Sequence, residues 1–349
     1  MASEMSSEMS SETATAWAER LAGLGLVVQC RVASMLREAF LAGTNSLSET
    51  VAEEGGDRIY AIDRHVEPLL ESEIANWPDE CFPLLLIAEG LGADGRKRIG
   101  DPDQPLRYRV IVDPIDGTRM LMYDKRSAWF LAAVAEDRGE ATSLNDTFAS
   151  VLVELPTTRQ NLADVFLTNR HQPTRGVRVE VGREPAALES GTPFPVRPCQ
   201  TPDLQDGFAT VSSFFPGTRR LAAELAERIA EKAGMVAAVP NLFDDQYIST
   251  GGQMVQLMTG RDRCVLDLRP EFNRILGRSG ENRFIESHPY DLAGLLALKQ
   301  AGVVVTDPSG NSLDAPLDVS TGVGWCGYAN EKIRSLVEPV VQEFLRGSG

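Results

Sequence analysis

Eleven residues near the middle of the chain constrain its fold more than any other segment. Residues 108–112 are few and rich in β-branched side chains, which predicts a buried strand rather than a helix. Pro114 has no N–H to donate and is expected to end that strand. Asp113 and Asp116 are then predicted to lie in a turn at the strand's end, where Gly117 can adopt a backbone conformation closed to other residues.

Two carboxylates at such a turn repel each other unless a cation lies between them. Oxygen ligands without histidine or cysteine favour a hard ion such as Mg²⁺. The alternative is an ordinary surface turn, because Asp, Pro and Gly are common turn residues whatever the function. The pair Asp113 and Asp116 by itself leaves both interpretations open.

Length and charge limit the classes of function. With 349 residues the chain is long enough for two domains. A net charge of −16 argues against binding to a nucleic-acid polymer or to an anionic membrane surface. Without a run of 18 apolar residues, no membrane span is predicted. An acidic protein can still bind a small phosphorylated substrate where bound metal reverses the local field.

The N-terminal residues and the cysteines indicate the cellular compartment. Residues 1–14 are rich in Ser, Glu and Met and lack the basic and apolar regions of a signal peptide, so we expect a disordered leader. The five cysteines are scattered without metal-binding spacing. A set of reduced thiols in a cytoplasmic protein is the simplest interpretation.

Hydrophobic periodicity outlines an N-terminal α+β domain over residues 15–198. Apolar residues spaced by three or four predict helices over 15–42 and 62–74, the second with Asp63 at its start, and the polar stretch 44–56 is expected to be a loop. Strands are predicted over 84–87, 128–135, 150–154 and 163–167. Because few helices separate them, a largely antiparallel sheet is expected.

A proline-rich segment, 191–202, is predicted to cross between domains. Beyond it strands and helices alternate, which is typical of an α/β domain over residues 199–349. The expected strands are 208–211, 235–239, 264–268, 303–306 and 321–326, and the expected helices are 218–232, 249–258, 291–300 and 330–345.

The string Asp113-Pro-Ile-Asp-Gly-Thr118 resembles the signature of the inositol monophosphatase (IMPase) superfamily of Mg²⁺-dependent, lithium-sensitive phosphatases. That superfamily also includes fructose-1,6-bisphosphatases and 3′-phosphoadenosine 5′-phosphate phosphatases. Glu89, Asp291 in Tyr-Asp-Leu-Ala-Gly, and Asp63 in Ala-Ile-Asp-Arg-His-Val-Glu are similar to its other motifs and follow in the family order. The haloacid-dehalogenase signature is excluded, because Pro114 stands where its nucleophilic Asp would be.

The resemblance implies a layered α-β-α-β-α sandwich of the IMPase and fructose-1,6-bisphosphatase type. It implies two or three Mg²⁺ ions, inhibition by Li⁺, and a homodimer. The implied metal ligands are Glu89, Asp113, the carbonyl of Ile115, Asp116 and Asp291. Water activation would belong to Thr118 with Asp63. Substrate contacts would come from Gly117, Thr118, Arg119, Ser249, Thr250 and Gly251.

Several of these residues also have a structural interpretation. Asp63 and Asp291 are predicted to open helices, where Asp is a favoured cap. Glu89 is at a strand end, where a solvated charge is common. Arg119 could meet a second phosphate or pair with an acidic neighbour. The glycines after Ser249 could reflect helix packing, and Lys125–Arg126 is expected to be a solvated pair.

Two positions depart from the family pattern: Gly90 replaces a second acidic residue after Glu89, and Tyr290 replaces a Trp before Asp291. The resemblance implies hydrolysis of a small phosphate monoester by metal-activated water. Fructose 1,6-bisphosphate and 3′-phosphoadenosine 5′-phosphate are alternative substrates. A non-catalytic relative that binds metal and phosphate is the alternative of another class.

Overall fold

The computed structural model describes residues 9–43, 50–54, 57–60, 62–91, 94–235 and 241–347. Its helices are α1 (Ser11–Ala42), α2 (Asp63–Ile74), α3 (Thr118–Met122), α4 (Arg219–Lys232), α5 (Thr250–Met258), α6 (Arg269–Ile275), α7 (Leu295–Gln300) and α8 (Glu331–Gly347). None of these described helices is long and apolar enough to span a membrane.

The first sheet has eight strands and carries most of the N-terminal half. In spatial order it contains β10 (Thr192–Phe194), β9 (Gln172–Glu180), β8 (Leu162–Asn169), β7 (Thr147–Leu155), β6 (Ala128–Glu136), β5 (Tyr108–Asp116), β3 (Leu84–Ala88) and β4 (Arg96–Ile99). Neighbouring strands are antiparallel except β3 and β5, which run parallel. The predicted, largely antiparallel sheet is confirmed.

The second sheet has five strands and is mixed. Its order is β12 (Leu242–Phe243), β11 (Gly207–Val211), β13 (Asp262–Asp267), β15 (Trp325–Tyr328) and β14 (Val304–Thr306). The first three are parallel, and β15 is antiparallel to both of its neighbours. The connection from β10 to β11 contains the predicted domain boundary at 198/199.

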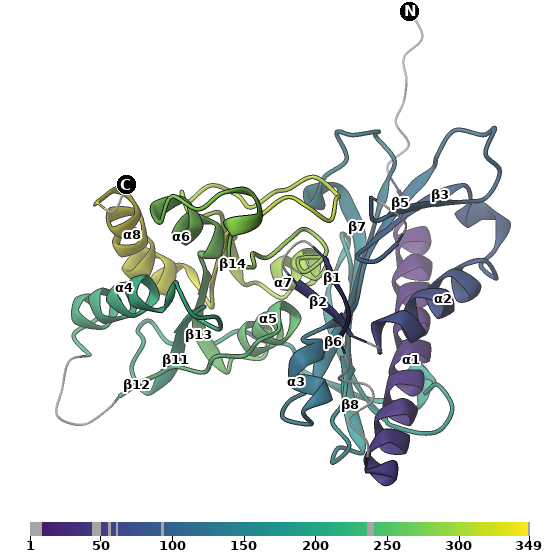
Figure 1. The fold of residues 1–349 in the computed structure, drawn as a ribbon, viewed down its shortest axis with the longest axis horizontal. Coiled ribbons are helices and arrows are strands. Elements are labelled where there is room, and N and C mark those ends of the chain that lie inside the picture. Colours follow the sequence, from purple (N-terminus) through teal and green to yellow (C-terminus); the bar gives the residue numbers. More distant parts are fainter. Residues whose placement is uncertain are drawn as a thin grey trace, which may run out of the picture.

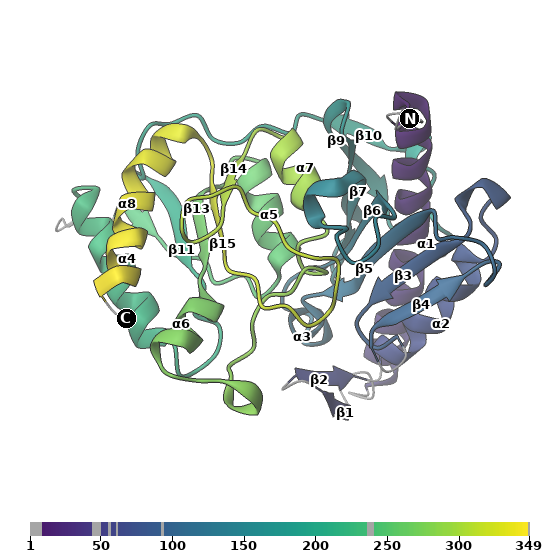
Figure 2. The same ribbon diagram turned by 90° about the horizontal axis from the view of Figure 1, so that it is seen from above.

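Helices and sheets form five layers (Figures 1 and 2). Helix α1 packs on β6, β7 and β8, with α2 beside it. Helices α5 and α7 lie between the two sheets, and α4 and α8 cover the outer face of the second sheet. The layered α-β-α-β-α sandwich is therefore confirmed.

Strand β6 shows why the central sheet needs a helix layer on each face. Alternate residues of a strand point to opposite faces of the sheet. Phe130 and Val134 belong to the core beneath α1, whereas Trp129 and Leu131 belong to the core shared with α5 and α7. A third core lies between the second sheet and helices α4 and α8. The continuous apolar run in β6 is thus the mark of a strand buried on both faces.

Two N-terminal expectations need correction. Helix α1 begins at Ser11, so residues 11–14 belong to the helix and not to a disordered leader. Ser10 caps it by accepting the N–H of Thr13 at 3.1 Å, and Ala14 is fully buried. Residues 1–8 lie outside the described residues. Within the expected loop 44–56, residues 50–54 form β1 (Thr50–Glu54), which pairs with β2 (Asp57–Tyr60).

The predicted strand over 235–239 falls mostly outside the described residues. The predicted strand over 321–326 begins later, at Trp325. The polar segment before it is held by side-chain bonds instead, because Asp318 accepts the N–H groups of Ser320 and Thr321 at 2.9 and 2.8 Å.

Candidate metal centre

Parallel pairing of β3 and β5 brings two acidic residues to one edge of the first sheet. Ala88 lies opposite Val112 in the register, and each is followed by an acid, Glu89 and Asp113. Because parallel strands end on the same side, the two side chains project from the same edge. This neighbour relation cannot be read from the 24 positions that separate the two residues in the sequence.

Pro114 does not end the strand, contrary to the prediction. Strand β5 continues to Asp116, and its pairing with β6 is irregular between Asp113 and Asp116. A bulge tolerates proline because its residues need not donate to the ladder. The Asp113 carboxylate accepts the N–H of Ile115 at 3.1 Å, which stabilises the bulge. Gly117 follows with φ of 95°, a left-handed conformation that turns the chain into α3.

Asp291 reaches the same place from the second half of the chain. It lies in a turn four residues before α7 and does not open that helix as predicted. The N–H of His288 donates to Asp291 Oδ2 at 2.6 Å, so the carboxylate caps a tight turn. The Ser150 hydroxyl of β7 donates to the carbonyl of Ala293 at 2.8 Å and fastens that turn to the first sheet.

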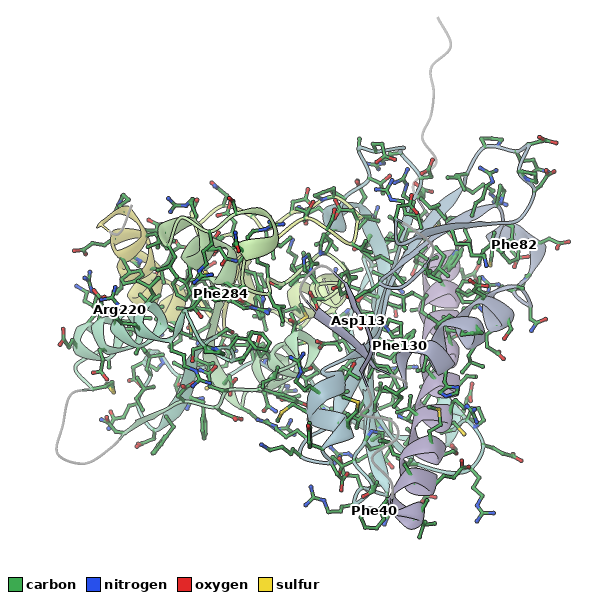
Figure 3. The ribbon with its side chains drawn as sticks, in the orientation of Figure 1. Phe40, Phe82, Asp113, Phe130, Arg220 and Phe284 are labelled. Carbon is green, nitrogen blue, oxygen red and sulfur yellow. The ribbon has the colours of Figure 1, made fainter. Side chains whose placement is uncertain are left out.

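Asp113, Asp116 and Asp291 converge, each with a carboxylate oxygen within 4.8 Å of the others. Figure 3 shows Asp113 where the two halves of the molecule meet. Burial, followed by the negative charge of Asp116, raises the pKa of Asp113 well above its usual value. Burial and Asp116 also raise the pKa of Asp291. The negative charge of Glu89, an exposed residue, contributes to the raised pKa of both Asp113 and Asp291.

Asp116 is bound by the start of α5. Its Oδ2 accepts the hydroxyl of Ser249 at 2.7 Å and the N–H of Gly251 at 2.6 Å, and its Oδ1 accepts the N–H of Thr250 at 3.1 Å. Burial raises the pKa of Asp116, and these hydrogen bonds offset part of the rise. Residues 249–251, predicted to contact substrate, are thus in contact with a predicted metal ligand, and their substrate role stays a prediction.

The donor set fits a hard divalent cation. The cluster consists of carboxylate oxygens, which suit Mg²⁺ better than softer metals. Three mutually repelling carboxylates in a desolvated position are unfavourable by themselves, and a cation among them removes the repulsion. After three hydrogen bonds, Asp116 Oδ1 still has a lone pair for a metal.

Of the two predicted catalytic residues, the structure describes the side chain of Thr118, which follows the end of β5. The Thr118 hydroxyl donates to the carbonyl of Ile115 at 2.7 Å. That carbonyl keeps a second lone pair, so its predicted metal contact is compatible with this hydrogen bond. Helix α2 begins at Asp63 as predicted, and the side chain of Asp63 lies outside what the structure describes.

Gly117 and Arg119 flank Thr118. A Cβ on Gly117 would lie 2.9 Å from the Cβ of Ser249, so a glycine here lets β5 approach the start of α5. The guanidinium carbon of Arg119 lies 5.7 Å from the ring centre of Phe215, in a cation–π arrangement. Contacts of these two residues with substrate stay predictions.

Sequence reasoning missed three residues around the cluster. His288 has its Nδ1 3.8 Å from the Asp291 carboxylate, and its position three residues before Asp291 was the available signal. Arg269 is buried and is bonded through Nε and Nη2 to the fully buried Asp267. The negative charge of Asp267, followed by those of Asp291 and Asp116, raises the pKa of Arg269. Tyr247 bridges the two halves of the chain. Nothing in the sequence marks Arg269 or Tyr247 as part of the site.

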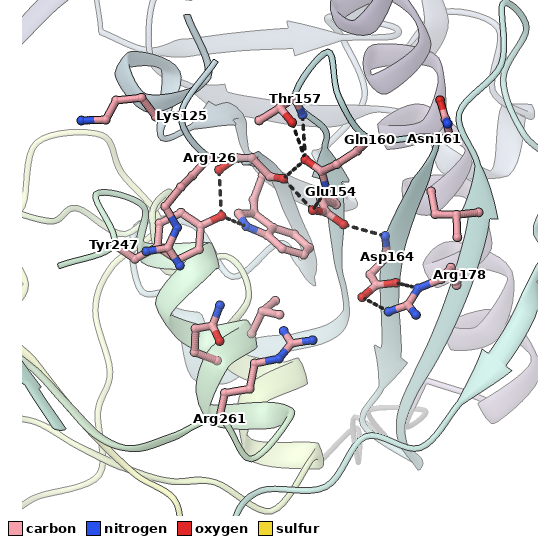
Figure 4. A pocket seen from close by; sticks show the side chains of 15 residues that line it. Lys125, Arg126, Glu154, Thr157, Gln160, Asn161, Asp164, Arg178, Tyr247 and Arg261 are labelled. Atoms are coloured by element: carbon pink, nitrogen blue, oxygen red, sulfur yellow. Dashed lines mark hydrogen bonds and ion pairs between the residues drawn. The ribbon is translucent and has the colours of Figure 1, made fainter. Parts of the chain in front are cut away.

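A cavity of about 670 Å³ lies beside Trp129 and Tyr247, with Arg126, Glu154 and Arg261 among its lining residues (Figure 4). None of the clustered carboxylates lines it. Arg126, expected to be solvated, instead bonds Asp245 at 2.7 Å and stacks on Tyr247. The cavity is therefore separate from the candidate metal centre.

No model of a known protein family matches the chain, and no curated protein matches it by sequence. Solved structures match it along almost its whole length. The extragenic suppressor protein SuhB of Bartonella henselae has a TM-score of 0.57 at 16% identity, covering 95% of this chain and 98% of SuhB. An IMPase of Thermotoga maritima has a TM-score of 0.56 at 16% identity, covering 93% and 97%.

The fructose-1,6-bisphosphatase of Leishmania major has a TM-score of 0.63 at 12% identity, covering 93% of each chain. The structural overlaps establish the fold. The sequence identities are too low to establish the chemistry, which has to be argued from the site. The order of the layers and the two sheets fits the same fold that these near-complete structural overlaps indicate. This chain therefore has the fold of the inositol monophosphatase and fructose-1,6-bisphosphatase superfamily.

Proposed function

We propose that the protein is a Mg²⁺-dependent phosphatase that hydrolyses a small phosphate monoester. The observation that carries the proposal is the convergence of Asp113, Asp116 and Asp291 between two sheets of the IMPase fold. With Glu89 and the carbonyl of Ile115, these side chains would hold the metal. Bound Mg²⁺ would supply the positive charge that neutralises a phosphate ester and lowers the pKa of an attacking water.

The chain's own residues would orient that water. The Thr118 hydroxyl donates its hydrogen to the Ile115 carbonyl, so toward a water molecule its oxygen would act as an acceptor. Asp63 remains our candidate for the proton acceptor, as the sequence motif implies. Gly117 and Thr118 are the candidates for backbone contacts to the phosphate. Catalysis would then consist of positioning and charge neutralisation, without a covalent phosphoenzyme.

Arg119 keeps a substrate with a second anionic group among the candidates. It follows Thr118 directly, and its guanidinium lies over the ring of Phe215. Arg269 does not support this choice, because its guanidinium is buried and already pairs with Asp267. Because of Arg119, fructose 1,6-bisphosphate and 3′-phosphoadenosine 5′-phosphate rank with inositol monophosphate as candidates.

Phosphate release from these three compounds, measured with Mg²⁺, with EDTA, and with Mg²⁺ plus Li⁺, tests the proposal. We expect Mg²⁺-dependent release that Li⁺ inhibits and that Asp113→Asn abolishes. Asp103→Asn, the same chemical change at an exposed loop residue, is the matched control. Metal binding without hydrolysis of any small ester would instead support the non-catalytic alternative.

A further inference from the structure

Tyr247 joins the two halves of the molecule next to the candidate metal centre. It lies between β12 and α5, and its side chain is 4% exposed. Its hydroxyl donates to the carbonyl of Ser127 at 2.7 Å and accepts the indole N–H of Trp129 at 3.0 Å (Figure 4). Ser127 directly precedes β6 and Trp129 is its second residue, so one hydroxyl holds this segment against the first sheet.

The ring of Tyr247 is also held. The guanidinium carbon of Arg126 lies 3.8 Å from the ring centre, while the same guanidinium bonds Asp245 at 2.7 Å. A Cβ on Gly252 would lie 2.4 Å from ring atoms, so the ring packs directly on the backbone of α5. These contacts fix Tyr247 between the first sheet and the helix.

Hydrogen bonds of Ser249 connect Tyr247 to the metal centre. Ser249 donates its N–H to the carbonyl of Tyr247 at 2.9 Å. The Ser249 hydroxyl then donates to Asp116 at 2.7 Å and accepts the N–H of Gly252 at 2.9 Å. With the N–H groups of Thr250 and Gly251, this places three donors around the Asp116 carboxylate. The orientation of Asp116 therefore depends on where residues 247–251 are held.

We propose that Tyr247 is a positioning residue for the metal centre, acting through Ser249 and the start of α5 on Asp116. The inference rests on the proposed function only in taking Asp116 as a metal ligand. Partners of ligands typically tune metal affinity because they fix the ligand's direction. Tyr247 itself need touch neither metal nor substrate.

Tyr247→Phe tests the inference, since it keeps the ring and removes the hydroxyl. Binding of Mn²⁺ as a probe is measured by electron paramagnetic resonance, and Mg²⁺ binding by calorimetry. We expect Kd for both ions to rise about three- to tenfold. Trp129→Phe removes one of the two hydroxyl bonds and should shift Kd in the same direction. Tyr123→Phe, at a tyrosine that is 68% exposed, should leave Kd unchanged.

A double-mutant cycle separates positioning from loss of stability. If Tyr247 acts through Ser249, the double variant Tyr247→Phe with Ser249→Ala binds Mn²⁺ about as weakly as Ser249→Ala alone. The proposal would be overturned if the Kd increase in the double variant equalled the product of the increases in the two single variants. It would also be overturned if Kd were unchanged in Tyr247→Phe and Trp129→Phe. Metal binding by the parent without phosphatase activity would contradict the proposed function and still leave this measurement valid.

Discussion

Gly251 donates its backbone N–H to the carboxylate of Asp116 at 2.6 Å, although 135 positions separate the two residues in the chain. The bond joins the bulge at the end of β5 to the first turn of α5. Negative charge is favourable at a helix N-terminus, where N–H groups lack partners within the helix. One carboxylate therefore serves the candidate metal centre and also fastens the two halves of the chain together.

Gly251→Ala should disturb that contact. An added Cβ would lie 2.6 Å from Leu131 Cδ2 and 3.0 Å from Asp116 Oδ2, so the start of α5 must move away from the carboxylate. We expect a loss of about 1–3 kcal/mol in the free energy of unfolding, measured by urea denaturation, and weaker Mg²⁺ binding.

Gly23→Ala is the matched control. Gly23 is an exposed residue of α1 with no atom within 4 Å of an added Cβ. Alanine there should stabilise the helix by up to about 1 kcal/mol. Equal effects of the two substitutions would contradict the role of the close approach at Gly251.

Asp113→Asn and Asp116→Asn should act in opposite directions on the metal-free protein. Among the described residues, Asp113 accepts one hydrogen bond, from Ile115, which an amide oxygen can also accept. Removing its charge relieves the repulsion that raises its pKa, so the melting temperature in EDTA should rise by a few degrees, on the order of 3 °C. Addition of Mg²⁺ should then stabilise this variant less than the parent.

Asp116→Asn should lower the melting temperature in EDTA. Its carboxylate accepts three donors on two oxygens, so an amide NH₂ in place of one oxygen would face a donor. The unpaired donors cost about 1–3 kcal/mol. The test is calorimetric melting of both variants with and without Mg²⁺, and a fall in both metal-free variants would count against the repulsive cluster.

Arg269→Ala should be strongly destabilising. Arg269 bonds Asp267 through Nε at 2.8 Å and Nη2 at 2.6 Å, and Asp267 is fully buried. Removing the guanidinium strands a buried carboxylate, at a cost of about 3–5 kcal/mol in urea denaturation. Adding Asp267→Asn to this variant should restore part of the loss, because it removes the stranded charge.

Arg228→Ala is the control for an exposed pair. Arg228 bonds Glu224 at 2.7 Å, with side-chain exposures of 45% and 47%. Such pairs contribute about 0–1 kcal/mol. A similar cost at both arginines would show that burial does not decide the effect.

Glu271→Gln should stabilise the protein in a pH-dependent way. Burial, with a contribution from Asp267, raises the pKa of Glu271 from 4.5 to about 7. Its Oε2 is buried and has no hydrogen-bond partner among the described residues. The folded state therefore binds this proton more tightly than the unfolded chain, and Glu271 lowers stability as pH rises from about 4.5 to about 7.

The expected gain from Glu271→Gln is small at pH 5 and reaches about 2–3 kcal/mol at pH 8, from urea denaturation at both pH values. Glu227→Gln, on the exposed side of α4, should show no such difference. A gain that is the same at pH 5 and pH 8 would argue against the raised pKa.

Local patterns in the sequence were sufficient for much of the fold. The apolar periods predicted α1, α2, α4 and α8 to within a few residues, because a side chain's face follows from its position in a helix or strand. The spacing of Asp113, Asp116 and Gly117 after an apolar run predicted acidic residues at a strand end, and the structure gathers two of them with Asp291.

The bulge at Pro114, the turn that holds Asp291 and the mixed second sheet were decided by the tertiary structure. So were the bonds from Ser249 and Gly251 to Asp116, the pairing of Arg269 with Asp267, and the position of Tyr247. The physical reason is common to all of them. A sequence pattern reports a residue's neighbours along the chain, whereas hydrogen bonds and charge repulsion depend on which distant segments fold side by side.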